Sequence, residues 1–417
     1  MTAFTPNIKI YSIPPNTSHD ATRTEITDWV DYSISATRGT SEYISAPYPA
    51  QTTVTLLFPE NVIPDIELGS WLEIGVYTAS TGTWSTIHSG NVTGRSSSYR
   101  AYGLEGFVLE WQFSLASGIS ILQNTVWYNE SNFTDTTEEC INKVYLETGH
   151  ILWNQVNSST TWAAYPPIAW DSIDDNVITQ LPVVTNLAGT ETQRLDAGYR
   201  NVWDDMVTLT YGVYGWMYED ATGAIVVDCG LFPPSLGMTI TQDMISPDIQ
   251  GGDALDKIRN YVTITEFDGV TSSYSDDESI GLYAQRTGAL STYLTTTLEA
   301  ANVGQKIING LAYPLLTTEQ ISLNLLNPIF TDAQRDLLLY QTLGQKVAIQ
   351  APVPMGGTQN YLIIGCQFDI TKDAFILGLT LAPYSQQYSS INWDQVPYNY
   401  TWTSYGVAFP TQEWQDL

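Results

Sequence analysis

Histidine, the side chain most often used for acid–base catalysis and metal binding, is scarce in this sequence. The chain contains only His19, His88 and His150. His88 falls in a strand-like segment and His150 follows Gly149, a residue typical of a helix end, so both are interpreted as structural. The motifs G-x-x-x-x-G-K-[ST], H-E-x-x-H and G-x-S-x-G are absent. We therefore predict no catalytic residue and no cofactor.

Adjacent acidic residues are the other group that could do chemistry, because two carboxyl groups about 5–10 Å apart can hydrolyse glycosides. They occur at Asp174 and Asp175, at Asp204 and Asp205, and at Asp276, Asp277 and Glu278. With 44 acids in the chain, such neighbours are expected by chance, and neighbours on a strand point to opposite faces. The stretch DSIDDN at 171–176 lacks the glycine of a calcium-binding EF-hand loop. We interpret these acids as solvated and predict no metal site.

The cysteines do not indicate a disulfide framework. Cys140, Cys229 and Cys366 are odd in number and far apart, with no zinc-binding spacing, so they are interpreted as small core residues. The N-terminal stretch lacks a basic start followed by an apolar run, and no segment reaches the ~18 apolar residues of a membrane span. We expect synthesis in a cytoplasm and no membrane span.

Composition favours a β-rich protein with a strongly acidic surface. Charged residues make up only 14% of the 417 residues and aromatics 12%, so Thr, Ser, Asn, Gln and Tyr must supply much of the polar surface. Fifteen Lys and Arg against 44 Asp and Glu give a net charge of −29. Such a surface repels phosphate, which argues against sequence-specific nucleic-acid binding and against attraction to anionic lipid.

One phrase occurs twice, as LGSWLEIGVYTASTGTWSTIHSG at 68–90 and as LGQKVAIQAPVPMGGTQNYLIIG at 343–365. We predict that the shared positions define a structural repeat: Gly69, Ile74 and Gly90 in the first copy, and Gly344, Ile349 and Gly365 in the second. The interval between the two glycines is 21 residues in both copies. Because order, spacing and flanking strand patterns agree, we favour duplication over two unrelated hairpins.

The patterns along the chain predict a mainly β protein with an α+β insertion. Apolar and polar residues alternate through 26–125 and again through 320–383, as in strands that face a core on one side. Helical spacing occurs between them, at 134–153, after 198 and at 290–311. We predict a first tube-like antiparallel β-barrel domain over 1–125, an α+β middle domain over 126–250, and a second β-barrel domain with an inserted helix over 251–385.

The remaining residues, 386–417, are crowded with Tyr and Trp and contain almost no aliphatic side chains. Such a segment would expose many rings unless it lay along another surface, and it is too aromatic for a solvated linker. We predict that this extended arm docks on a neighbouring subunit through Trp393, Trp402 and Trp414.

The whole arrangement resembles the baseplate hub and tail-tip proteins of tailed bacteriophages. The resemblance is carried by Arg38-Gly39 at a strand end, TVTL at 53–56, the Gly-x-x-apolar-x-apolar strand after Gly69, and Gly90-x-Val92. The WMYEDATGAIVVD hairpin, the Arg259-Asn260-x-Val262 strand start and the final strands at 343–383 agree with it. The pattern covers nearly the whole of 26–383.

This resemblance implies a homotrimer in which two barrels per chain present six similar units to a hexameric tail tube. It further implies a virion protein at the tail tip, assembled in the host cytoplasm, which lets DNA pass without binding it. Its partners would be the tail tube, distal tail proteins, the tape measure protein, and tail fibres or receptor-binding proteins. Two alternatives remain open: a carbohydrate-binding adhesin, suggested by 13 Trp and 26 Tyr, and a cell-wall hydrolase, for which too few residues follow the second barrel.

Overall fold

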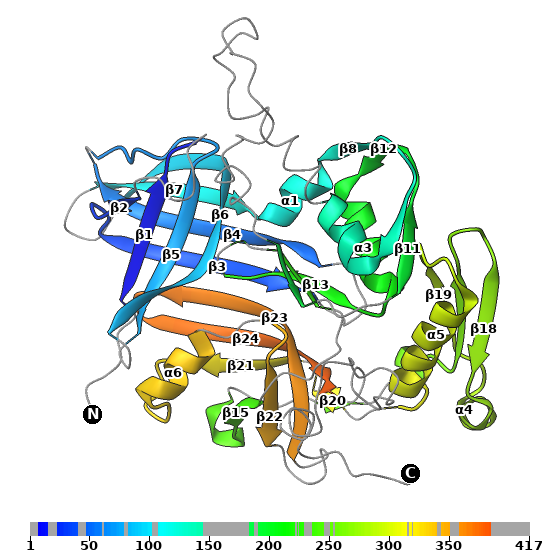
Figure 1. Cartoon of the computed structure of the whole chain (residues 1–417). Coiled ribbons are helices and arrows are strands. Elements are labelled where there is room, and N and C mark those ends of the chain that lie inside the picture. Colours follow the sequence, from blue (N-terminus) through cyan, green and yellow to red (C-terminus); the bar gives the residue numbers. More distant parts are fainter. Residues whose placement is uncertain are drawn as a thin grey trace, which may run out of the picture.

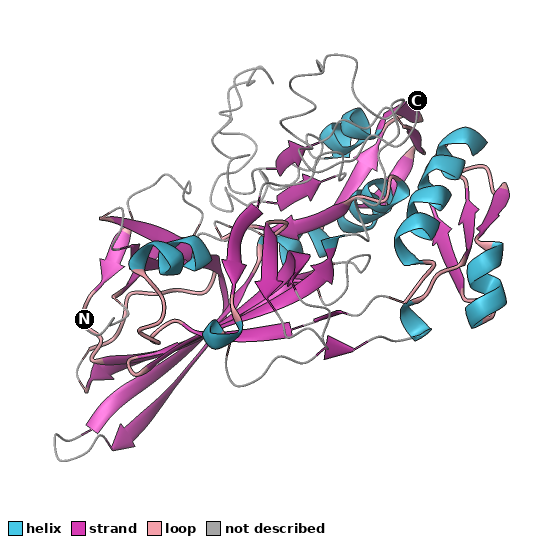
Figure 2. Ribbon diagram, turned by 90° about the horizontal axis from the view of Figure 1, so that it is seen from below, coloured by secondary structure: helices cyan, strands magenta, loops and turns pink. Residues whose placement is uncertain are grey.

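The computed structural model describes two groups of strands, a middle α+β unit and a smaller α+β unit at one end of the molecule (Figures 1 and 2). The described residues are 7–15, 23–40, 47–60, 62–78, 82–101, 107–144, 183–186, 191–221, 223, 225–228, 236–245, 251–252, 255–314, 317–318, 320–339, 343–350 and 358–384. Trp393, Trp402 and Trp414 lie outside this set, so their predicted docking stays a prediction.

The first group of strands, the first repeat, contains β1 (Ile8–Ile13), β2 (Thr24–Ile26), β3 (Asp31–Gly39), β4 (Tyr48–Pro59), β5 (Trp71–Thr78), β6 (Thr83–Ala101) and β7 (Phe107–Ala116). Their alternating apolar side chains face one core: Ile34, Val54, Leu72, Ile74 and Phe113 are all at most 1% exposed. This burial explains the alternating sequence pattern, because one face of each strand packs on the core and the other faces solvent.

The second repeat contains β15 (Leu236–Ile240), β16 (Gly251–Gly252), β20 (Thr317–Thr318), β21 (Gln320–Asn324), β22 (Lys346–Gln350), β23 (Thr358–Thr371) and β24 (Ala374–Pro383). A short 3₁₀ turn, η4 (Gln242–Met244), follows β15, and α6 (Asp332–Leu339) connects β21 to β22. Buried Arg335 fixes this connection, because its Nε donates to the Leu325 carbonyl oxygen at 2.8 Å.

Twelve of the fourteen strands in the two repeats form one sheet, and β16 and β20 form a separate pair. The main path of the sheet runs β15-β22-β23-β3-β4-β7-β6-β5-β1-β2, and β24 pairs with β23 and β21 beside it. The pairing of β23 with β3 joins the repeats, as Figure 1 shows where orange β23 lies beside blue β3. Buried residues of both repeats form a single hydrophobic cluster. β15 falls within the range predicted for the middle domain, yet it pairs with β22 of the second repeat.

The middle unit has its own core. It comprises α1 (Gly118–Gln123), β8 (Val126–Asn129), β9 (Phe133–Thr136), helical residues 137–144, β10 (Val183–Asn186), β11 (Thr192–Leu195), β12 (Gly198–Asn201), α3 (Val202–Gly212), β13 (Trp216–Glu219) and β14 (Ile225–Asp228). Trp127, Met206 and Ile225 are among the residues buried in it. Asn201 begins α3 because its side chain accepts a hydrogen bond from the Asp204 N–H.

The unit at one end is inserted into the second repeat between β16 and β20. It consists of η5 (Leu255–Lys257), β17 (Tyr261–Thr265), β18 (Thr271–Ser275), α4 (Asp277–Tyr283), β19 (Thr287–Ser291) and α5 (Thr297–Leu311). Helix α5 packs on β17 and β18 through residues at helical spacing, including Val303 and Ile307. The insertion is therefore a small α+β unit, larger than the single helix at 290–311 that the sequence indicates.

These observations confirm the predicted fold class, a mainly β protein with helices in an α+β part. Among the described residues, no helix is long and apolar enough to cross a membrane.

Candidate functional site: the junction between the two repeats

The two Leu-Gly turns have the same geometry. Gly69 and Gly344 both have φ of +86°, a conformation that favours glycine. The Gly69 N–H donates to the Val92 carbonyl oxygen at 2.8 Å, and the Gly344 N–H donates to that of Ile363 at 2.7 Å. The same partner residues also donate in the other direction. The Val92 N–H donates to the Ser70 carbonyl oxygen, and the Ile363 N–H donates to that of Gln345. The two turns are therefore equivalent in backbone conformation and in hydrogen bonding.

The strand register extends this equivalence along both hairpins. Leu72 lies opposite Gly90, and Val347, three residues after its own turn glycine like Leu72, lies opposite Tyr361. Ile74 and Ile349, both fully buried, occupy corresponding places, because Ile74 pairs with His88 and Ile349 with Gln359.

The register corrects the sequence alignment at one position. The counterpart of Gly365 is Gly94, not Gly90, since each of Gly94 and Gly365 lies just after a register shift in its strand. Eighteen residues separate the paired Leu72 and Gly90, against fourteen between the corresponding Val347 and Tyr361. The equal interval of 21 residues therefore matches Gly365 with Gly90, which lies four residues before its structural counterpart Gly94.

Two further strands complete the correspondence. Gly94 pairs with Ser114 and Gly365 with Thr380; Ser114 then pairs with Thr53, and Thr380 with Gln320. The order β4-β7-β6-β5 thus matches β21-β24-β23-β22 in direction and register. Two unrelated hairpins would share a turn, but not four strands in one register. The chain therefore carries the same four-stranded unit twice.

Close backbone contact marks the place where β3 meets β23. Gly39 has φ of +98° and lies opposite Gly365, and a Cβ atom on Gly39 would sit 2.6 Å from the Gly365 Cα. The neighbouring Thr40 N–H donates to the Ile364 carbonyl oxygen at 2.9 Å. Only glycine therefore fits this position without moving the two repeats apart.

Buried polar side chains surround the same junction. Arg38 is 6% exposed, and its Nε donates to the Cys366 Sγ at 3.0 Å. His88 Nε2 lies 2.5 Å from the Thr52 hydroxyl, and burial together with the Arg38 cation lowers the pKa of His88 to about 3. His88 is therefore neutral at physiological pH and has a structural partner, in line with the structural role that we interpret from the sequence.

Glu219 at the end of β13 brings the middle unit into this polar cluster. Its Oε1 accepts a hydrogen bond from the Gly118 N–H at 3.0 Å, and the residue is 2% exposed. Burial raises the pKa of Glu219 to about 7, while hydrogen bonding to Ser117 and Gly118 and the Arg38 charge act in the opposite direction. This carboxyl group changes protonation near neutral pH inside a structural joint.

The hairpin β13–β14 contacts both repeats, at the Leu-Gly turn of the second and at the start of β5 in the first. The Trp216 ring lies against Gly344, where an added Cβ would be 2.7 Å from its Cζ2 atom. At the other end of the hairpin, Gly223 packs on Trp71, and a Cβ there would be 2.8 Å from that ring. The middle unit therefore contacts both repeats, at Gly344 in the second and at Trp71 in the first.

The acidic residues considered above do not converge on a catalytic pair. Asp205 is buried, with hydrogen bonds from Trp127 Nε1 at 2.8 Å, Arg200 Nη2 at 2.6 Å and the Tyr293 hydroxyl at 3.0 Å. Its neighbour Asp204 is exposed.

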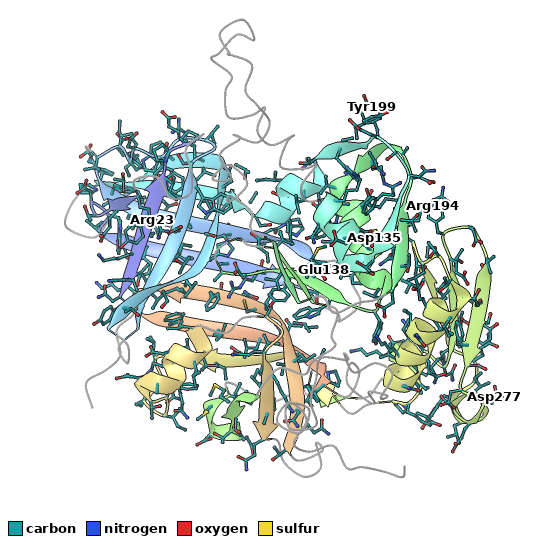
Figure 3. The ribbon with its side chains drawn as sticks, viewed as in Figure 1. Arg23, Asp135, Glu138, Arg194, Tyr199 and Asp277 are labelled. Atoms are coloured by element: carbon teal, nitrogen blue, oxygen red, sulfur yellow. The ribbon has the colours of Figure 1, made fainter. Side chains whose placement is uncertain are left out.

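The other acidic residues have local roles or lie far apart. Asp276 accepts a hydrogen bond from the Ser279 N–H at the start of α4. In Figure 3, Asp135 and Glu138 lie on the middle unit, far from Asp277 on the inserted unit. Asp174 and Asp175 lie outside the described residues, as do His19, His150 and Cys229.

Metal-binding and reactive-thiol chemistry receive no support from the described part of the chain. No three His, Cys, Asp or Glu side chains gather there in a way that could hold a metal ion. Cys140 and Cys366 are buried free cysteines, and burial raises the pKa of the Cys140 thiol to about 11. The geometry that the two repeats share lies in turns, strand edges and buried joints, which suits a mechanical role.

Comparison with known proteins identifies the fold. No family model and no curated protein sequence matches the chain. The solved structures that match almost end to end include three tail proteins. A 43 kDa tail protein of prophage MuSo2 from Shewanella oneidensis has a TM-score of 0.57 and 12% identity, covering 91% of this chain and 99% of that one. A tail protein from Neisseria meningitidis MC58 has a TM-score of 0.55 and 14% identity, covering 91% and 98%.

The prophage tail protein gp18 from Listeria monocytogenes EGD-e has a TM-score of 0.50 and 12% identity, covering 90% of this chain and 95% of that one. The chain therefore has the fold of phage tail proteins, and the resemblance expected from the sequence is confirmed at the level of the fold.

Proposed function

We propose that this chain is a structural protein of a bacteriophage tail and forms the trimeric hub of its baseplate or tip. The observation that carries the proposal is the four-stranded unit that occurs twice in one register. Three chains would then contribute six near-equivalent units, which suits contact with a sixfold tube without requiring six chains. The similarity of fold to prophage tail proteins supports this role.

The charge suits a wall that DNA passes without binding. Three copies would carry 3 × −29 = −87 charges. An acidic lining repels phosphate, so the duplex would slide through the ring toward the host. In this proposal the ring closes or lines the exit channel, and its partners are the tail tube, distal tail proteins, the tape measure protein, and fibres or receptor-binding proteins.

We propose no enzymatic activity for the chain. The buried acid Asp205 accepts hydrogen bonds from three residues, and buried His88 is neutral and lies against the Thr52 hydroxyl, so both side chains have structural partners.

Electron microscopy of intact tails tests the hub proposal. Labelled or tagged chain should lie at the distal end, in three copies around the tail axis. Location on a fibre, or a single copy in each particle, would contradict it.

One observation favours a carbohydrate-binding adhesin as a second candidate. Tyr128 on β8 and Tyr199 on β12 are 51% and 82% exposed, and their ring centroids lie 4.9 Å apart. Figure 3 shows Tyr199 at the outer end of the middle unit, where it is accessible. Exposed aromatic rings can stack on sugars. A glycan array should then detect binding that Tyr199→Ala removes, whereas the hub proposal expects no glycan binding at this pair.

A further inference from the structure

The edge of β6 differs from the corresponding edge in the second repeat. Residues 83–91 of β6 pair with β5, and residues 91–101 pair with β7 on the other side. Beyond Val92, the edge that faces away from β7 has no backbone partner among the described residues. The open edge is therefore residues 94–101, and its Tyr99 is 68% exposed.

In the second repeat the same edge is occupied. β24 pairs with residues 361–371 of β23, so the pairing of β3 with residues 365–371 must use the opposite edge. That edge corresponds to residues 94–100 of β6, because Gly365 corresponds to Gly94. A strand of the first repeat thus completes the second, while none of the described strands takes the corresponding place in the first repeat.

The second repeat has described residues where a counterpart of β3 belongs. Ile245 forms an antiparallel bridge with Leu323, as Tyr32 of β3 does with Leu56. Farther along, β16 pairs with β20, as the end of β3 pairs with the start of β4. Gly252 follows Ile245 by seven residues, and Gly39 follows Tyr32 by the same number.

We propose that the open edge of β6 is an intersubunit surface whose occupant is a second copy of this chain, which places its Ile245 and its β16 along that edge. This inference rests on the proposed function and names the contact that would close the ring. An unpaired strand edge readily accepts a strand through main-chain hydrogen bonds. The intrachain pairing of β3 with β23 supplies the template for its antiparallel direction.

The glycines give a second, independent argument. At the joint inside the chain, Gly39 lies opposite Gly365 in a contact too close for a Cβ atom. The proposed joint places Gly252 opposite Gly94 or the neighbouring residue, so it also brings two glycine backbones together. When Gly94 is aligned with Gly365, the buried residues Cys366, Phe368 and Ile370 correspond to Arg95, Ser97 and Tyr99. Main-chain hydrogen bonds rather than apolar packing would therefore hold the proposed contact.

Photo-crosslinking of the purified full chain tests this contact. Tyr99 is replaced by p-benzoylphenylalanine, and isotopically heavy and light copies are mixed, dissociated and reassembled before irradiation. Mass spectrometry should find heavy–light links from position 99 to the segment 245–252. The same replacement at Tyr199, 82% exposed on the middle unit, should give no link to that segment. Mass photometry of the same samples reports the oligomeric state.

The outcomes separate the two claims. A trimer whose links from position 99 reach other segments, or only its own copy, would overturn this inference and leave the hub proposal standing. A chain that remains monomeric at every concentration would contradict both.

Substitution provides a second readout. Gly252→Val should abolish the trimer while the melting temperature of the monomer changes little. The control Gly281→Ala, where an added Cβ meets no atom within 4 Å, should leave the trimer intact. A trimer that persists in Gly252→Val at wild-type concentration dependence would contradict the proposed joint.

Discussion

The Nε of Arg38 in the first repeat donates to the Sγ of Cys366 in the second, 3.0 Å away and 328 residues later in the chain. This buried contact lies beside the Gly39–Gly365 pair and within the electrostatic reach of Glu219 and His88. The repeats are therefore joined by a specific polar contact as well as by a strand pairing. Removing this contact should lower the stability of the fold while leaving its strands and helices in place.

Arg38→Ala should lower the free energy of unfolding by about 2–4 kcal/mol. The substitution removes a buried cation that donates a hydrogen bond to Cys366 and interacts electrostatically with Glu219. Urea denaturation followed by tryptophan fluorescence measures this loss. Arg100→Ala is the matched control, since Arg100 pairs with Glu110 on the surface, where ion pairs contribute about 0–1 kcal/mol. Equal losses in the two variants would show that the Arg38 contact does not join the repeats.

Gly39→Ala should destabilise the fold by more than about 2 kcal/mol, because positive φ and the collision with β23 both oppose a side chain. Gly269→Ala is the control: its φ of +87° is also positive, but an added Cβ meets nothing within 4 Å. It should cost only about 1 kcal/mol. Thermal melting measures the loss of stability in both variants. A similar loss in both would show that the close contact between Gly39 and Gly365 does not matter for stability.

Glu219 should make stability depend on pH. The folded chain keeps the Glu219 proton up to about pH 7, whereas the unfolded chain releases it near its ordinary pKa of 4.5. Between these values the folded state binds more protons, so the contribution of this group falls as pH rises, by at most ~3 kcal/mol.

Glu219→Gln should therefore match the wild type near pH 5 and exceed its stability at pH 8, in denaturation curves recorded across that range. The groups that face Glu219 electrostatically are Arg38 and Asp220, and Glu139→Gln, an exposed acid, should leave the pH profile unchanged. A wild-type profile retained in Glu219→Gln would assign the pH dependence to other groups.

Deletion of 386–417 should prevent assembly without unfolding the rest of the chain. Its aromatic residues, among them Trp393, Trp402 and Trp414, are predicted to dock on a neighbouring subunit. Circular dichroism should show the β-rich fold retained, while mass photometry should show only monomer. Assembly that is unaffected by the deletion would refute the predicted docking.

Local signals in the sequence predicted the turns and strands well. Glycines at 69 and 344 mark turns that need positive φ, and alternation marks buried faces such as those of β5 and β22. The helix that the sequence predicts at 290–311 begins later in the structure, at Thr297, because the Thr296 hydroxyl accepts a hydrogen bond from the Glu299 N–H and β19 occupies 287–291. The segment 268–279, which has the composition of a loop, contains β18, whose Ser and Thr pair with β17.

Nonlocal features could not be found from one sequence. Equal glycine intervals suggested that Gly90 corresponds to Gly365, but the first hairpin is four residues longer between corresponding pairs, so only the register reveals Gly94. The pairing of β3 with β23 joins segments more than 300 residues apart, and no spacing rule encodes it. The Trp216–Gly344 and Trp71–Gly223 contacts join the middle unit to the repeats, and no sequence pattern predicts them either.

The most direct test of the central claim is a cryo-electron microscopy reconstruction of the assembled tail tip without imposed symmetry. We predict three copies of this chain, with the β4-β7-β6-β5 units and the β21-β24-β23-β22 units alternating at about 60° around the tail axis. Six copies in the ring, or the two units of one chain facing different directions away from a common axis, would contradict the account.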